Sequence, residues 1–145
     1  GRGKLMRYAI TEGEAFLRLS DGEELHLSIA AACEEYSIDS AIILGGLGMA
    51  REITFGWYTG KEYLRERVEG TFEVASLSGD VSRREGALYP HIHAVFNGMD
   101  HASLGGHVLK VVAFHNMEVF IRPLRSIRLN REYDGWLEAI VPEKR

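Results

Sequence analysis

Residues 90–93 read Pro90-His91-Ile92-His93, and a second histidine motif, Gly105-Gly106-His107, follows downstream. The runs of residues around both motifs are typical of β-strands. Successive side chains of a strand point to opposite faces, so His91 and His93 share one face and Ile92 points to the other. The first motif therefore presents two imidazoles side by side on one face of a sheet.

A third imidazole from a neighbouring strand would complete a face of three nitrogen ligands. A divalent metal such as zinc accepts this arrangement and keeps a fourth position open for water or a ligand. A His-x-His pair on a half-exposed strand is also common as plain polar surface. The residues alone leave both interpretations open.

Composition indicates a single globular domain. The chain has 145 residues, of which 46% are hydrophobic and 26% are charged. No apolar run approaches the roughly 20 residues that cross a membrane, so we expect no membrane partner. The net charge of −4 argues against strong DNA binding by the whole domain, because phosphate recognition needs a basic face, although a local basic patch remains an alternative.

The single cysteine, Cys33, excludes an internal disulfide. No secretory signal is recognisable at the start, so the expected compartment is a reducing cytoplasm. The first methionine is Met6, and residues 1–6 are expected to be a tag remnant or a disordered start. Residues 7–145 are then expected to form the domain.

The first part of the chain predicts two strands and one helix. The strands are expected over 7–10 and 15–19, and helical spacing of apolar residues predicts a helix over Glu23–Tyr36 with both Glu23 and Glu24 in its first turn. The run 39–44 is predicted to be a strand buried on both faces. The following Gly45-Gly46-Leu47-Gly48 lacks the third glycine and the helix of a dinucleotide-binding loop, which leaves a turn or a bulge.

The second part of the chain predicts further strands. They are expected over 70–80, 91–96, 105–114 and 117–121, with a polar loop at 82–89 and a tail that turns at 134–135. The sum is a single α+β domain, with a mainly antiparallel β-sheet and one principal flanking helix.

Glu73 is a candidate site residue. Strict alternation within 70–80 places Glu73 with Ala75 and Leu77 on an apolar face. A carboxylate there is costly to bury unless it is paired or bound to something. The alternative is that Glu73 lies in water at the end of the strand.

The order of these motifs resembles the PPC domain, the plants and prokaryotes conserved domain, also called DUF296. The resemblance covers about Arg7 to Arg122. It rests on the helix start at 22–24, the glycines at 45–48, the run Glu73-Val74-Ala75-Ser76-Leu77-Ser78-Gly79, the two histidine motifs, and Glu118-Val119.

The resemblance implies a mainly antiparallel sheet with a flanking helix, assembled as a homotrimer of the bare prokaryotic type. It implies that His91, His93 and His107 hold a metal, for which we expect zinc. Glu73 and Glu118 match acidic positions of the family and are candidates to orient the site, Glu73 being the better one. The DNA-binding part of the plant function does not transfer, because residues 1–4 lack the Arg-Gly-Arg-Pro core of an AT-hook.

Two further histidines, His101 and His115, lie outside the motifs. His101 is close enough in sequence to approach the site from a loop, but both residues are expected to be solvated.

Three functions follow. The first is a trimeric, metal-binding module with a regulatory or small-ligand-binding role. The second is a zinc-dependent hydrolase or lyase that uses the same site with Glu73 as base. The third is DNA binding through basic clusters that are otherwise solvated surface or ion pairs between subunits; the clusters contain Arg83, Arg84, Arg122, Arg125, Arg128 and Arg131.

Overall fold

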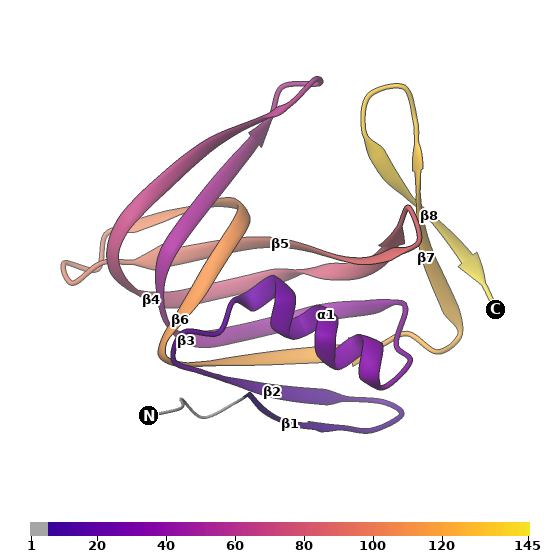
Figure 1. Cartoon of the computed structure of the whole chain (residues 1–145), viewed down its shortest axis with the longest axis horizontal. Coiled ribbons are helices and arrows are strands. Elements are labelled where there is room, and N and C mark those ends of the chain that lie inside the picture. Colours follow the sequence, from indigo (N-terminus) through magenta and orange to yellow (C-terminus); the bar gives the residue numbers. More distant parts are fainter. Residues whose placement is uncertain (1–5) are drawn as a thin grey trace.

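The computed structural model describes residues 6–145 (Figure 1). The expectation for residues 1–5 lies outside these described residues, and Met6 packs against the hydrophobic core. The elements are β1 (Arg7–Ile10), β2 (Ala15–Ser20), α1 (Leu25–Glu35), β3 (Ala41–Tyr58), β4 (Tyr63–Arg84), β5 (Ala87–Asn97), β6 (Ser103–Pro123), β7 (Ile127–Tyr133) and β8 (Glu138–Lys144). Within 6–145, no helix has the length and apolar character needed to cross a membrane.

The strands form one sheet in the order β1-β2-β6-β3-β4-β7-β8, and β5 pairs with both β4 and β6. Pairings therefore close a ring through β3, β4, β5 and β6. All pairings are antiparallel except one parallel contact, Arg83 with Asn130, between β4 and β7. The α+β prediction is confirmed, but the sheet is mixed rather than purely antiparallel, because β7 runs alongside the end of β4 before it pairs with β8.

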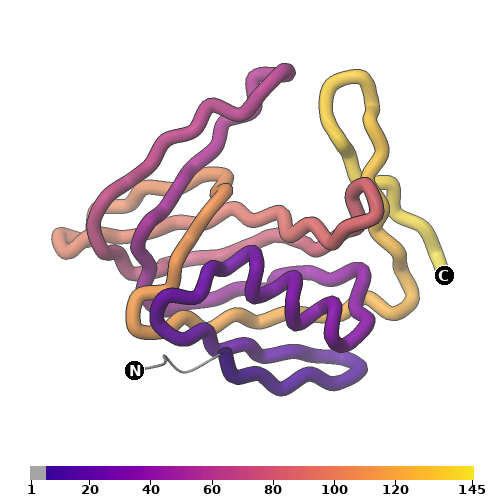
Figure 2. The backbone as a smooth tube through the Cα atoms, in the orientation of Figure 1, coloured from indigo at the N-terminus to yellow at the C-terminus, as the bar shows by residue number. Residues whose placement is uncertain are grey.

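Two hairpins rise from the body of the sheet and flank its central strands (Figures 1 and 2). One is the outer part of β3 and β4, which we call the long arm (residues 50–70). The other is formed by β7 and β8 and is called the C-terminal hairpin (residues 127–144). The helix α1 lies across the body of the sheet, away from both tips.

The helix is shorter than predicted. It begins at Leu25, because Glu24 has the extended backbone of an N-cap, with φ −90° and ψ 135°. The predicted start at Glu23, with two acids in the first turn, is therefore wrong. The buried face of the helix has the predicted spacing, and Cys33 lies on it as core filler.

The start of β3 is buried on one face only. Ala41 and Ile43 are buried against the helix side, whereas Ile42 and Leu44 are 36% and 56% exposed. The prediction of a strand buried on both faces is wrong, because the described residues form one helix, which covers one face of the sheet.

The long strands continue through predicted breaks. Gly45-Gly46-Leu47-Gly48 lies inside β3, where the register with β6 shifts twice, so the bulge interpretation is confirmed and the turn is wrong. The two strands predicted over 105–121 are one bent strand, β6, in which His115 adopts a φ of 66°. The predicted loop at 82–89 is a tight turn at Glu85-Gly86. The glycines at 45–48 and His115 therefore lie at irregularities within continuous strands, and Glu85-Gly86 turns the chain tightly between β4 and β5.

A bulge also changes the faces of β4. The register with β5 shifts between Val74 and Ser76, so Val74 and Leu77 are both buried although they are three residues apart. The predicted alternation through 70–80 is wrong for this reason. Glu73 is exposed to solvent.

Glu24 connects the helix to the sheet. Its carboxylate accepts hydrogen bonds from the backbone N–H groups of Leu27, at 3.0 Å, and Val111, at 2.9 Å, and lies 2.9 Å from Nδ1 of His26. Burial opposes ionisation, but these contacts outweigh it and hold the pKa of the Glu24 carboxyl below its ordinary value. Ionised Glu24 therefore stabilises the folded state.

We expect Glu24→Gln to lower the free energy of unfolding by about 1–3 kcal/mol at pH 7, as for hydrogen bonds to a charged group. A depressed folded pKa gives stability that is present above the unfolded pKa and is lost as pH falls through the folded value. Urea unfolding at pH 7 and pH 3 should show the deficit shrinking at the lower pH. Glu14→Gln, at an exposed position, is the control. An equal deficit at both pH values would contradict this role.

Close approach of β4 to β5 requires Gly79. A Cβ at this position would overlap the backbone carbonyl oxygen of His91, which cannot move without shifting the histidine strand. We expect Gly79→Ala to destabilise the fold by about 1–3 kcal/mol or more. Gly13→Ala is the matched control, because a Cβ there meets nothing within 4 Å. Similar denaturation midpoints for the two variants would show that β5 shifts without cost, and would contradict the requirement for glycine at position 79.

Candidate metal centre

Two adjacent strands bring three histidines together. His91 and His93 lie two residues apart on β5, and His93 is the direct partner of His107 on β6. One ligand nitrogen from each ring lies within 4.8 Å of those of the other two. The structure thus places the third imidazole, that of His107, on the neighbouring strand, beside the two that the family resemblance groups with it.

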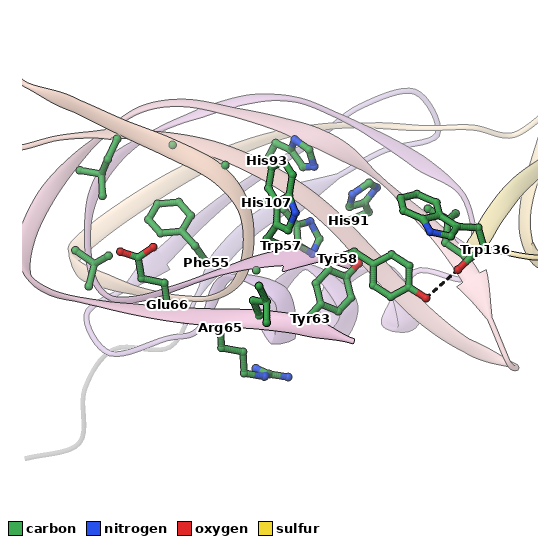
Figure 3. Close-up of a pocket in the computed structure, with 17 residues that line it drawn as sticks. Phe55, Trp57, Tyr58, Tyr63, Arg65, Glu66, His91, His93, His107 and Trp136 are labelled. Carbon is green, nitrogen blue, oxygen red and sulfur yellow. Dashed lines mark hydrogen bonds between the residues drawn. The ribbon is translucent and has the colours of Figure 1, made fainter. Parts of the chain in front are cut away.

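The three rings converge at one side of a pocket (Figure 3). Ring centroids are 5.1 Å apart for His91 and His93, 5.1 Å for His91 and His107, and 5.4 Å for His93 and His107. Zinc with Zn–N bonds of about 2.0–2.1 Å brings tetrahedral ligand nitrogens to about 3.4 Å from each other. The ligand nitrogens, which lie within 4.8 Å of one another, would draw closer together to bind the ion.

Burial keeps two of the imidazoles neutral. It lowers the pKa of His91 to about 4, with further repulsion from Arg131 and His93, and it lowers the pKa of His107 to about 4, with repulsion from His91 and His93. Neutral imidazole is the form that binds a metal, so these two rings are ready to ligate at pH 7.

Nε2 of His107 is a buried polar atom without a hydrogen-bond partner among the described residues. Such an atom costs about 1–3 kcal/mol when it stays unsatisfied. A bound cation would satisfy it. The residues present therefore fit a metal ion in both chemistry and geometry.

Arg131 of β7 contacts the site from the C-terminal hairpin. Its Nη2 lies 3.3 Å from Nδ1 of His91 and donates to Asp80 at 3.2 Å. Its other nitrogens donate to Ser82 and to the Glu138 carbonyl, both at 2.8 Å. Burial raises the pKa of Asp80, and Arg131 partly opposes this. The sequence analysis placed Arg131 only in a basic cluster, because no local pattern signals a contact with a strand 40 residues away.

The pocket beside the histidines has a volume of about 940 Å³ and lies between the long arm and the C-terminal hairpin. Tyr63 stacks on His107 with ring centroids 5.0 Å apart and an interplanar angle of 15°. Tyr58 packs against Trp136 at 5.3 Å, and its hydroxyl donates to the Trp136 carbonyl at 2.8 Å. The arm and the hairpin therefore meet across one side of the pocket.

The structure does not bring the two predicted acids to the site. Glu73 lies opposite Asn97 of β5 in the strand register, and its side chain is exposed. Neither Glu73 nor Glu118 lines the pocket. Glu118 lies beyond the bend of β6, opposite Arg18.

His101 and His115 also lie outside the pocket lining, and both are exposed, as expected. Each has a positive φ, 67° and 66° respectively, and the His115 N–H donates to Asp21 at 2.7 Å. Their observed roles are in a turn and at a strand bend.

Comparison with known proteins identifies the family. A family model described as the Plants and Prokaryotes Conserved (PCC) domain matches residues 6–125. A plant- and prokaryote-conserved (PPC) protein from Pyrococcus horikoshii is 26% identical, with a TM-score of 0.81 over 99% of this chain and 97% of that one. A metal-containing protein from Archaeoglobus fulgidus is 30% identical, with a TM-score of 0.81 over 95% and 99%.

A protein from Bacteroides thetaiotaomicron, described as a DNA-binding candidate, is 23% identical, with a TM-score of 0.84 over 97% of this chain and 99% of that one, and shows the fold alone. No curated protein matches the sequence. The match over residues 6–125 and the likeness to the Archaeoglobus protein, together with the paired histidine motifs, show that this chain belongs to the Plants and Prokaryotes Conserved domain family.

Proposed function

We propose that this chain is a metal-binding module that holds zinc through His91, His93 and His107 and binds a small ligand at the metal in a regulatory or binding role. The observation that carries the proposal is the convergence of three imidazoles, one of which, His107, has a buried Nε2 with no hydrogen-bond partner among residues 6–145. An all-nitrogen ligand set suits zinc. The relative from Archaeoglobus fulgidus is described as metal-containing, which supports a metal site in this chain.

Bound zinc supplies a Lewis-acid centre with a fourth position open to an external ligand. The chain's own groups would orient the ligating rings. Asp80 lies directly opposite His91 in the register of β4 and β5 and accepts from Arg131, whose Nη2 also lies 3.3 Å from Nδ1 of His91. An arginine only donates hydrogen bonds, so Nδ1 of His91 would accept and its Nε2 would remain to ligate, with Arg131 fixing the orientation of the ring.

The hydrolase or lyase alternative has less support. It needs a base near the metal, and Glu73 is exposed and outside the pocket lining. Among the described residues, the acid that lines the pocket is Glu66, on the long arm. A binding role requires no such base and is favoured for that reason.

DNA binding is the weaker alternative. The neighbours described as DNA-binding candidates are 23% and 24% identical, which carries only the fold to this chain. Several arginines of the basic clusters make contacts within the chain: Arg131 with Asp80, Arg125 with Glu12, and Arg83 with the Gly86 carbonyl. These guanidinium groups already make contacts within the chain, so fewer of their N–H donors are available to bind phosphate.

We also propose the homotrimer that the family resemblance implies. The sheet face opposite the helix exposes an apolar surface, which we call the outer face. Its members and their exposed fractions are Phe16 45%, Ile42 36%, Leu44 56% and Leu47 47%. Contiguous exposed apolar surface commonly marks a protein–protein interface. Copies of the chain packed on the outer face would remove it from water.

Metal analysis tests the zinc site. Protein purified without a metal-affinity step should contain about one zinc per chain, and His93→Ala should lose most of it, because removing one of three ligands leaves a weak site. His101→Ala is the matched control, since His101 lies outside the cluster. Absence of zinc after addition and dialysis would refute the site.

Light scattering after size exclusion tests the trimer. Leu44→Glu should dissociate the assembly, because it places a charge on the outer face. Leu27→Glu is the control, since Leu27 is an equally large apolar residue, 71% exposed, on the helix. A wild-type protein that elutes with the mass of one chain would contradict the proposal.

A further inference from the structure

The charge around the proposed metal is unbalanced. All three ligands are imidazoles, so a divalent cation would keep its full charge, and bound ions are often the largest local charges in a site. Among the described residues that line the pocket, the charged side chains besides histidine are Arg65 and Glu66, one of each sign, on the long arm. In Figure 3 both extend away from the histidines.

The carboxylate opposite His91 on β4, that of Asp80, does not compensate this charge. Asp80 is paired with Arg131 at 3.2 Å, and the same guanidinium group contacts His91 at 3.3 Å. The other nitrogens of Arg131 are committed to Ser82 and to the Glu138 carbonyl. The open position on the metal therefore favours an anionic ligand.

The wall beside that position is aromatic. Starting at the metal ligand His107, Tyr63 stacks on the imidazole at 5.0 Å, Tyr58 packs on Tyr63 at 5.2 Å, and Trp136 packs on Tyr58 at 5.3 Å. Aromatic rings gain most from contact with other flat rings, stacked or edge to face. This row favours a planar body next to the anionic group.

Part of the pocket lining carries no side chains, which leaves room for a ligand. The volume of the pocket is that of a small-molecule site. Gly105 and Gly106 precede His107 on β6 and line the pocket without side chains. The volume of about 940 Å³ lies within the range of about 300–1,000 Å³ that is usual for ligand pockets.

We propose that the pocket binds a small aromatic carboxylate. The carboxylate occupies the open position on the metal, and the ring lies against the wall of Tyr63, Tyr58 and Trp136. This inference rests on the zinc site proposed above and names the class of its ligand. The binding step exchanges one ligand of the metal for another and involves no covalent or redox change in the protein.

Titration calorimetry on the zinc-loaded protein tests the ligand class with three probes. Benzoate carries both features, benzamide has the ring without the charge, and cyclohexanecarboxylate has the charge without the planar ring. We expect benzoate to bind at least about tenfold more tightly than either of the others, and its binding to disappear after zinc is removed by a chelator. Equal affinity for benzamide or for cyclohexanecarboxylate would overturn the proposal.

A variant of the wall provides the second test. Tyr63→Leu should weaken benzoate binding several-fold, the effect expected for the loss of one aromatic contact. Tyr133→Leu is the control, because Tyr133 is 67% exposed and does not line the pocket. Zinc content is measured for each protein before titration. Failure of zinc uptake by the wild type would refute the metal site itself, whereas zinc uptake without preference for benzoate would overturn the ligand class alone.

Discussion

The antiparallel register between β5 and β6 is the constraint on which the rest of the site depends. It places His93 directly beside His107, while the spacing of two residues on β5 brings His91 to the same face. A slip of one residue would turn every side chain of β5 to the opposite face and bury the imidazoles in the core. The register is held by Ile92 and Phe96, which are almost fully buried on the other side of the same strand. One strand therefore carries core residues on one face and two of the three clustered histidines on the other, so core packing also fixes the geometry of the site.

The electrostatics of the site follow from the same placement. Strands closed in a ring hold His91 and His107 partly out of water, and burial lowers the pKa of both imidazoles to about 4. Rings that stay neutral at pH 7 do not repel a cation. The buried Nε2 of His107 has no hydrogen-bond partner within the described part of the chain, and a cation would serve as one. Burial that is unfavourable for a charged histidine is therefore favourable for a ligating one.

The C-terminal hairpin completes the pocket, although it lies beyond residue 125, where the family match ends. Arg131 contacts His91 and Asp80 from β7, and Trp136 at the tip of the hairpin packs against Tyr58 of the long arm. The three clustered histidines thus belong to the matched domain, while part of the pocket wall comes from the segment after it.

Local periodicity in the sequence determined which elements form and which faces the histidines share. Alternation along β5 and helical spacing through Cys33 depend only on near neighbours, so the His-x-His face, the single helix and the α+β class were predictable. The tertiary structure decided the rest. The bulge after Val74 put Leu77 on the buried face with Val74, which left Glu73 on the exposed face. One long bent β6 replaced two predicted strands, because backbone hydrogen bonds from distant strands continue through local breaks. Arg131 and Trp136 reach the site only through pairings across the chain, and a pattern of neighbouring residues carries no information about such pairings.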